Sequence, residues 1–228
     1  HEKEVANFDM LSNGVVDGFI VAVSEETQIV KKFNHYEDAL NDGKSIVMFD
    51  RLIDSIPCTK IITNDYTAIS EATNNLIALK RNKIILVSSI NNLNVGKQRT
   101  KGYRKAMEQA GLYSVVIESN RNEIENILQS YAENNAFDAV IALDTDASFA
   151  VYKVTRELRK NIPSDIAVIG YMSERIAPYL TPELTTINQH SFSMGKTAAK
   201  MLLVQLESKQ NTNQTVLIDS TMSQRVSS

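Results

Sequence analysis

The sequence predicts an α/β protein with parallel sheets, and three observations lead to that prediction. Short apolar strands alternate with segments of helical period as far as about residue 205. Most of these strands are β-branched runs without polar alternation, which is typical of strands buried on both faces of a parallel sheet. Nine strands are many for one open sheet, and the polar stretch Asn91–Asn94 interrupts the pattern. We therefore expect two doubly wound subdomains.

Strands are expected where β-branched and aliphatic residues are densest. These segments are Val16–Val23, Ser45–Phe49, Lys60–Thr63, Lys83–Ser88, Ser114–Glu118, Ala139–Leu143, Ile166–Tyr171, Thr185–Ile187 and Val216–Asp219. Helices are expected where apolar residues recur every three to four positions. These segments are Glu2–Leu11, Thr27–Leu40, Ile69–Leu79, Arg99–Ala110, Glu123–Glu133, Ser148–Lys160 and Phe192–Glu207. Gly14, Gly43 and Gly111 each follow a periodic stretch, where a left-handed residue ends a helix.

The composition is that of an ordinary globular protein and excludes several classes. The 228 residues are 43% hydrophobic and 22% charged, and the formal net charge of −3 argues against a broad basic surface for nucleic acid. Cys58 is the single cysteine, so no intrachain disulfide forms, and the three histidines have no metal-ligand spacing. We expect no bound metal.

The chain has no feature of a membrane or secreted protein. No apolar run approaches the ~20 residues that cross a bilayer. The opening residues His1–Glu4 lack the basic and apolar regions of a signal peptide, so we expect a cytoplasmic protein in a reducing compartment. Because the chain opens within a charged, helix-like stretch, we also expect further sequence to precede it.

The sequence contains neither of two common enzyme motifs, the phosphate loop and the nucleophile elbow. Gly96-Lys97 superficially suggests a phosphate loop, but that motif needs glycine where Asn91 stands and serine or threonine where Gln98 stands. No Gly-x-Ser-x-Gly nucleophile elbow occurs. We expect no catalytic residues, no cofactor and no enzymatic reaction.

Polar residues stand directly after several predicted strands, where ligands bind in open parallel sheets. They are Asp50 and Arg51, Asn64 and Asp65, Asp144 and Asp146, and Met172-Ser173. A helix N-cap is an equally good explanation for Asp65 and Asp146. Arg99 is expected to start a helix, where a cation is unfavourable against the helix dipole. A ligand explains that placement, and a surface salt bridge is the alternative.

Several motifs in a fixed order give the chain a family resemblance that covers nearly its whole length. They are Val16-Asp17-Gly18-Phe19-Ile20, Phe49-Asp50-Arg51, Arg99-x-x-Gly102-Tyr103, Ile162-Pro163-x-Asp165 through Gly170-Tyr171, Leu184-Thr185-Thr186-Ile187-x-Gln189, Met194-Gly195-Lys196-x-Ala198 and Arg225-x-Ser227-Ser228. Together they resemble the effector-binding core of the lac-repressor (LacI/GalR) family of bacterial transcription regulators.

The resemblance implies a periplasmic-binding-protein-like fold, in which two Rossmann-like subdomains are joined by three crossings. Residues 1–90 and 190–215 would form the N-terminal subdomain, and residues 91–189 and 216–228 the C-terminal one. Relatives also carry an N-terminal helix-turn-helix, a hinge helix and a first strand, helix and strand. None of these matches the chain, which begins after them.

The resemblance also implies site residues. The ligand-contacting arginine of the family matches Arg99, and the acidic residue that follows a sheet strand matches Asp144. Leu143 replaces a usual Asn and Met172-Ser173 replaces a usual Asp, which removes polar contacts to a family-typical sugar. Three further positions match near the cleft or the crossings. They are Asp50, Asp65 and Gln189. We expect Arg99→Ala to weaken ligand binding by ~1.5–3 kcal/mol with little loss of fold stability.

We interpret the chain as the ligand-sensing core of a LacI-type regulator, with a sugar or related metabolite bound in the interdomain cleft. Operator DNA would contact only a domain that precedes this sequence. The resemblance, together with the apolar surface segment containing Ile176, Tyr179 and Leu180, predicts a twofold homodimer. The resemblance also implies that helix Ser148–Lys160 takes part in the interface. A loop folded back on its own subdomain is the alternative there. The rival function is a periplasmic sugar-binding protein of a transport system.

Overall fold

The computed structural model describes residues 1–228 and divides the chain into two compact units. The first unit comprises His1–Thr63 and His190–Asp219, and the second comprises Asn64–Gln189 and Ser220–Ser228. The chain therefore passes between the units three times. Both units have the expected α/β architecture with parallel strands, which confirms the fold class.

The first boundary lies after Thr63 and not near residue 90, the position predicted from the sequence. The unit changes after Thr63, because the helix over residues 65–78 packs on the helix over residues 94–109 and the strand over residues 84–88 pairs within the second sheet. The polar stretch Asn91–Asn94 is only the turn between that strand and the next helix. The last boundary lies after Asp219 instead of residue 215, because residues 215–218 pair with the first sheet.

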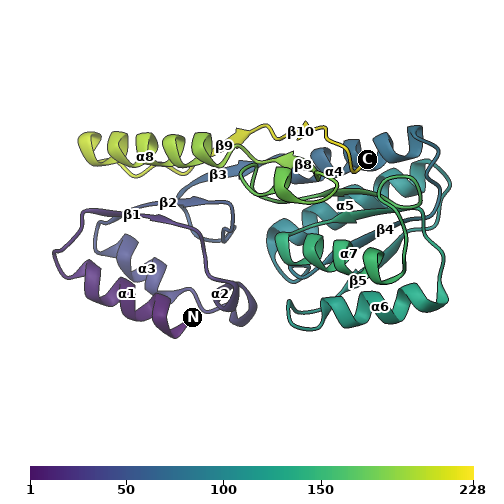
Figure 1. Ribbon diagram of the computed structural model, residues 1–228. Helices are drawn as coiled ribbons and strands as arrows, with labels where there is room; N and C mark the ends of the chain where they lie inside the picture. The colour runs from purple at the N-terminus through teal and green to yellow at the C-terminus, as the bar shows by residue number, and fades with distance from the viewer. The chain divides into compact units, whose positions relative to one another are not determined.

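The first unit contains a four-stranded parallel sheet with the order β1-β2-β3-β9. Its strands are β1 (Gly18–Val21), β2 (Ser45–Phe49), β3 (Thr59–Thr63) and β9 (Thr215–Ile218). Its helices are α1 (Glu2–Ser12), α2 (Glu25–Val30), α3 (Asn34–Asn41) and α8 (Ser191–Ser208). In Figure 1, α1 and α3 cover one face of this sheet and α8 covers the other.

The alternation of side chains along β2 explains these two layers. Ile46 and Met48 belong to the core that contains Phe8 of α1 and Tyr36 of α3. Val47, which points to the opposite face, packs with Met194 and Ala198 of α8. A strand buried on both faces thus needs apolar residues at successive positions, as the sequence has them.

The second unit contains a six-stranded sheet with the order β10-β8-β7-β6-β4-β5. Its strands are β4 (Ile84–Ser88), β5 (Val115–Glu118), β6 (Ala139–Ala142), β7 (Ala167–Gly170), β8 (Thr185–Asn188) and β10 (Thr221–Ser223). Only β10 pairs antiparallel, with β8. The α-helices are α4 (Asp65–Ala78), α5 (Asn94–Gln109), α6 (Ile124–Asn134) and α7 (Thr145–Glu157), and Ala177–Tyr179 forms a short 3-10 helix, η1.

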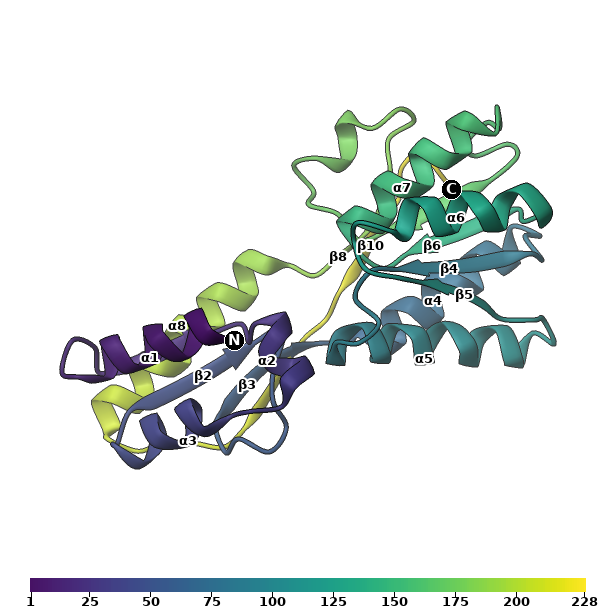
Figure 2. The ribbon, with the colours of Figure 1, turned by 90° about the horizontal axis from the view of Figure 1, so that it is seen from below.

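Helices cover both faces of the second sheet. Figure 2 shows α6 and α7 on one side of β4 and β6, and α4 and α5 on the other. Leu128 of α6 and Val151 of α7 share one core with Val140 of β6. Ile69 of α4 and Tyr103 of α5 belong to the core on the opposite face. The carboxyl ends of β4, β6 and β7 therefore lie together at one edge of a rigid, double-sided layer.

The structure has a strand in each of the nine expected segments, and several other elements differ from the expected ones. It adds β10. The expected helix Thr27–Leu40 is two helices, because Lys31 takes a left-handed conformation with φ 55° and ends α2. The expected helix Arg99–Ala110 begins at Asn94. The positive φ of Gly14, Gly43 and Gly111 is confirmed. No helix is long and apolar enough to span a bilayer.

Candidate functional site

Arg99 lies at the centre of the best-defined polar cluster of the second unit. It is the sixth residue of α5, so the expectation that it opens a helix is wrong, and the argument from the helix dipole does not apply. Its side chain is only 4% exposed. A buried guanidinium needs several partners, because its charge is costly to remove from water.

Three segments of the chain supply those partners. The Nε of Arg99 donates to Oδ1 of Asp65 at 2.6 Å, and Nη1 donates to the carbonyl of Leu143 at 2.8 Å. The guanidinium carbon lies 3.6 Å from the ring centroid of Tyr171, a cation–π contact. The Tyr171 hydroxyl also donates to Asp65, at 3.4 Å. Arg99 thus joins the first residue of α4 to the residues that follow β6 and β7.

This geometry changes the expected effect of replacing Arg99. Its ion pair with Asp65 is buried on both sides, with exposed fractions of 4% and 7%. Removing one partner of such a pair costs ~3–5 kcal/mol, because the other charge stays buried. The structure therefore predicts a substantial loss of stability for Arg99→Ala, in place of the small loss expected from the sequence.

Asp144 directly follows the Leu143 carbonyl and caps α7. Its Oδ1 accepts from the amide of Ala147 at 2.8 Å and from the hydroxyl of Ser89 at 2.8 Å. Its Oδ2 accepts from the Ser89 amide at 2.7 Å. The carboxylate therefore fastens the end of β4 to the start of α7. Ser89 is not among the residues predicted from the sequence, although it directly follows β4 just as Asp144 follows a strand.

Neither Asp65 nor Asp146 is a helix N-cap, which was the alternative explanation for both residues. Asp65 is the first residue of α4, whose cap is Asn64, and its carboxylate pairs with Arg99. Asp146 lies inside α7 and is exposed, with its carboxylate 3.8 Å from Arg121. The cap of α7 is Asp144 instead.

The turn between β4 and α5 carries a second polar group at the same sheet edge. Thr100 donates its hydroxyl to Asn91 at 2.6 Å, and the Asn91 amide donates to Glu118 at the end of β5. A Cβ on Gly96 would lie 2.1 Å from the carbonyl of Ile90, so this turn wraps closely against the helix. The glycine of the false phosphate loop is thus required for packing.

The remaining expected site residues lie elsewhere. Asp50 is in the first unit, directly after β2, and has a positive φ of 58°. Its amide donates to the Ile61 carbonyl at 3.1 Å, and the neighbouring Arg51 pairs with Glu25 at 3.2 Å. Gln189 is half-buried, follows β8 and is the last residue before the second crossing.

Leu143 and Met172, which stand where the lac-repressor family has polar residues, also lie in apolar surroundings. Leu143 is fully buried in the core beneath α4 and α5. Met172 is 7% exposed and belongs to the core beneath α6 and α7. Neither position offers a polar contact to a ligand at the carboxyl ends of β6 and β7.

The closing motif Arg225-x-Ser227-Ser228 serves to hold the chain end. Arg225 donates to the hydroxyl of Thr186 at 2.7 Å and to the carboxylate of Glu174 at 2.5 Å. Burial raises the pKa of Glu174, but hydrogen bonds from Thr186 and Arg225 outweigh it and leave that pKa below its ordinary value. Ser227 donates to the Val168 carbonyl at 2.6 Å. These contacts bind the C-terminal segment to β7 and β8.

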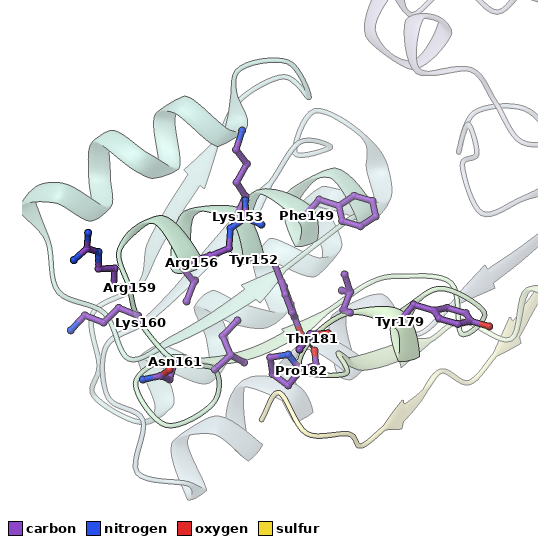
Figure 3. A pocket seen from close by; sticks show the side chains of 13 residues that line it. Phe149, Tyr152, Lys153, Arg156, Arg159, Lys160, Asn161, Tyr179, Thr181 and Pro182 are labelled. Carbon is purple, nitrogen blue, oxygen red and sulfur yellow. Dashed lines mark hydrogen bonds between the residues drawn. The ribbon is translucent and has the colours of Figure 1, made fainter.

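The segment expected at a dimer interface is largely on the surface. Ile176 is 44% and Tyr179 86% exposed, whereas Ala177 is buried and Leu180 packs partly on the core. Tyr179 and Leu180 border a groove of about 830 Å³ along α7 (Figure 3). Part of the segment thus folds back on its own unit, while two large apolar side chains remain exposed. No group of three or more His, Cys, Asp or Glu side chains is placed to hold a metal ion.

Comparison with known proteins gives consistent matches. The family described as a periplasmic binding protein-like domain matches residues 73–228. The ribose operon repressor of Bacillus subtilis (strain 168) is 31% identical over 206 residues, which cover 89% of this chain and 60% of that protein. The HTH-type transcriptional regulator RegA of Clostridium saccharobutylicum is 27% identical over 221 residues, covering 92% and 64%. The chain spans less than two thirds of the length of either relative.

A solved structure has the same fold. The crystal structure of a LacI family transcriptional regulator from Enterococcus faecium with bound ribose matches with a TM-score of 0.87 and 23% identity. The match covers 98% of this chain and 83% of that one. Together with the family match over residues 73–228, this assigns the chain. It belongs to the periplasmic binding protein-like domain family.

Proposed function

We propose that this chain is the ligand-sensing and self-associating core of a LacI-type transcription regulator, without a catalytic step. A small polyhydroxylated ligand, a sugar or a related metabolite, binds at the carboxyl ends of the parallel strands. Its binding shifts the population of conformations and so changes DNA binding by a domain outside these 228 residues.

The observation that carries the proposal is the polar edge of the second sheet. Asp144 and Ser89 are already fixed to each other at the ends of β6 and β4. The buried Arg99–Asp65 pair supports the adjoining loop through the Leu143 carbonyl. Rigidly held carboxylate and hydroxyl groups on strand ends are suited to a ligand rich in hydroxyl groups, because little order is lost on binding.

The known relatives support a sugar as the ligand class. One curated relative is a ribose operon repressor, and the matched solved structure contains ribose. The buried residues Leu143 and Met172 stand where members of the lac-repressor family have polar residues. We therefore propose a ligand that makes fewer polar contacts at the ends of β6 and β7 than a family-typical sugar does.

Thermal-shift measurements with a panel of pentoses, hexoses, nucleosides and purines test the proposal. A ligand at 100 times its Kd stabilises the folded state by about 2.7 kcal/mol, because it binds only that state. For a chain of this length that corresponds to a rise in Tm of about 5–10 °C. A folded protein whose Tm responds to none of these compounds would contradict the sugar-sensing role.

Asp144→Asn and Asp146→Asn form a matched pair for calorimetry with the ligand that emerges. Both remove one carboxylate charge from the start of α7, but only Asp144 is fastened to Ser89. We expect Asp144→Asn to weaken binding by about tenfold or more, since a charged hydrogen bond is worth ~1.5–3 kcal/mol, and Asp146→Asn to have little effect. Equal affinities for both variants would remove Asp144 from the site.

A further inference from the structure

Two strands that lead to the first unit form a ribbon at one edge of the second sheet. β8 and β10 pair antiparallel there and lie side by side in Figure 2. The chain leaves the second unit after Gln189, one residue beyond β8, and enters it again at Ser220, directly before β10. The first crossing is joined to the same place, because the Ser220 amide donates to Oδ1 of Asn64 at 2.8 Å. All three crossings therefore connect to the β8–β10 ribbon.

Glu174 is bound to both sides of this ribbon. It lies between β7 and η1, two residues before Ile176. Its Oε1 accepts from the hydroxyl of Thr186 in β8, and its Oε2 accepts at 2.5 Å from Nη2 of Arg225, which follows β10. Nη1 of Arg225 donates to the Thr186 hydroxyl at 2.7 Å, so the three side chains form a closed ring. Thr186 is fully buried and the Arg225 side chain is 14% exposed, so water competes little for these bonds.

The segments that this ring joins are each anchored by other contacts. The Ser227 hydroxyl holds the chain end, because it donates to the Val168 carbonyl at 2.6 Å and accepts from the Thr185 amide at 2.8 Å. Ala177 anchors η1 in the core of the second unit. The ring is thus an additional connection between two segments, and neither segment depends on it alone for its place in the fold.

We propose that Glu174 is a positioning residue that couples the η1 segment, residues 176–180, to the β8–β10 ribbon. A change at the crossings then reaches the exposed side chains of Ile176 and Tyr179. The inference rests on the proposed ligand response and self-association. Charge-assisted hydrogen bonds hold their groups at fixed distance and direction, so a carboxylate that is bound from both sides of the ribbon follows its movement. Because linkage is reciprocal, self-association through the η1 segment favours one arrangement of the ribbon in turn.

Amide hydrogen exchange tests the coupling, because a change made in one segment should appear in the other. Arg225→Gln alters the C-terminal segment, residues 220–228, but we expect it to speed exchange in the η1 segment as well, by about tenfold or more. Glu174→Ala should conversely speed exchange in β10. Gln224→Ala is the matched control, since it removes a 2.7 Å bond to the Ser228 carbonyl in the same C-terminal segment and leaves the ring intact. It should not change exchange in the η1 segment.

Exchange in β6 reports opening of the whole unit and should be the same in every variant. Glu174→Gln keeps an oxygen that accepts hydrogen bonds, so it should show the same pattern as Glu174→Ala with a smaller amplitude. Effects of Arg225→Gln that stay within residues 220–228 would overturn the coupling. An equal rise in β6 and η1 for Arg225→Gln and Glu174→Gln would also overturn it, because the ring would then support only global stability.

Sedimentation velocity at micromolar concentrations tests whether the coupling reaches the self-association surface. We expect Glu174→Ala and Arg225→Gln to weaken dimerisation by about fivefold or more, the lower end of typical coupling between sites, and Gln224→Ala to leave it unchanged. Equally strong dimers of all these variants would overturn transmission to that surface. A wild-type monomer with exchange effects in both segments would overturn the proposed self-association and support the coupling, whereas the thermal-shift panel judges the ligand-sensing role separately.

Discussion

At the scale of single residues, Arg99 holds together three segments of the second unit. Its guanidinium is held by Asp65, the Leu143 carbonyl and the Tyr171 ring. The resemblance to a regulator family assigns this arginine to the ligand. The geometry adds that it fixes the loops on which a ligand would rest, so its loss would reduce both stability and binding.

The buried Arg99–Asp65 pair should contribute to stability as a coupled unit. Arg99→Ala should lower the free energy of unfolding by ~3–5 kcal/mol, because Asp65 is left buried and unpaired. Adding Asp65→Asn should recover part of that loss, and urea denaturation of the two single variants and the double variant measures the coupling. Arg104→Ala, exposed on the same helix, should change stability by no more than about 0.5 kcal/mol. Strictly additive losses would show that the pair is not coupled.

A second residue-scale prediction concerns Glu4 in the first unit. Burial raises the pKa of its carboxyl, but hydrogen bonds from His35, Tyr36 and the Ser24 amide prevail and lower that pKa from 4.5 to about 2. Because the folded pKa lies below the unfolded one, the stabilisation is complete above pH 4.5 and is lost as pH falls towards 2.

Denaturation between pH 6 and pH 2.5 measures this effect. Glu4→Gln should lose less stability than wild type over the acid part of this range, because the titrating group is gone. Glu2→Gln, exposed on the same helix, should follow the wild-type curve. Parallel curves for Glu4→Gln and wild type would contradict the lowered pKa.

At the scale of elements, the close crossing of α4 and α5 illustrates what a glycine permits. A Cβ on Gly102 would lie 2.2 Å from the carbonyl of Tyr66, so the two helices touch through their backbones. Gly195 in α8 has nothing within 4 Å of its Cβ position. The two glycines therefore serve opposite purposes, although both lie within helices.

Replacing each with alanine should move stability in opposite directions. Gly102→Ala should destabilise by at least ~1–3 kcal/mol, because the helices must separate. Gly195→Ala should stabilise by about 0.5–1 kcal/mol, because glycine loses more backbone entropy than alanine on folding. Urea midpoints measure both changes, and a neutral Gly102→Ala would show that the crossing tolerates a methyl group.

At the scale of the whole molecule, the exposed aromatic and aliphatic residues near α7 predict self-association. Tyr179→Asp should shift wild-type dimers to monomers at micromolar concentrations in sedimentation, because it places a charge in the apolar patch with Ile176. Tyr113→Asp is the matched control, since Tyr113 is 94% exposed elsewhere in the second unit. A Tyr179→Asp variant that dimerises as strongly as the Tyr113→Asp control would exclude this interface.

The sequence by itself determined the fold class and the order of the elements, because hydrophobic period and β-branched composition are local properties that burial imposes on each segment. The same local rules failed where Lys31 adopts a left-handed conformation and divides the expected helix. Lysine is not a residue type that favours the left-handed conformation, so the sequence does not predict it here. The short β10 was missed because its pairing with β8 depends on a strand far away in the chain.

Only the tertiary structure decided which polar residues meet. The sequence selected Asp65, Arg99 and Asp144 one by one, but not the pairing of Asp65 with Arg99 or of Ser89 with Asp144. It also placed the first unit boundary near residue 90, whereas sheet pairing puts residues 64–90 in the second unit. Partners in these cases lie 34 and 55 residues apart. Such contacts depend on strand order and helix packing, which no local pattern encodes.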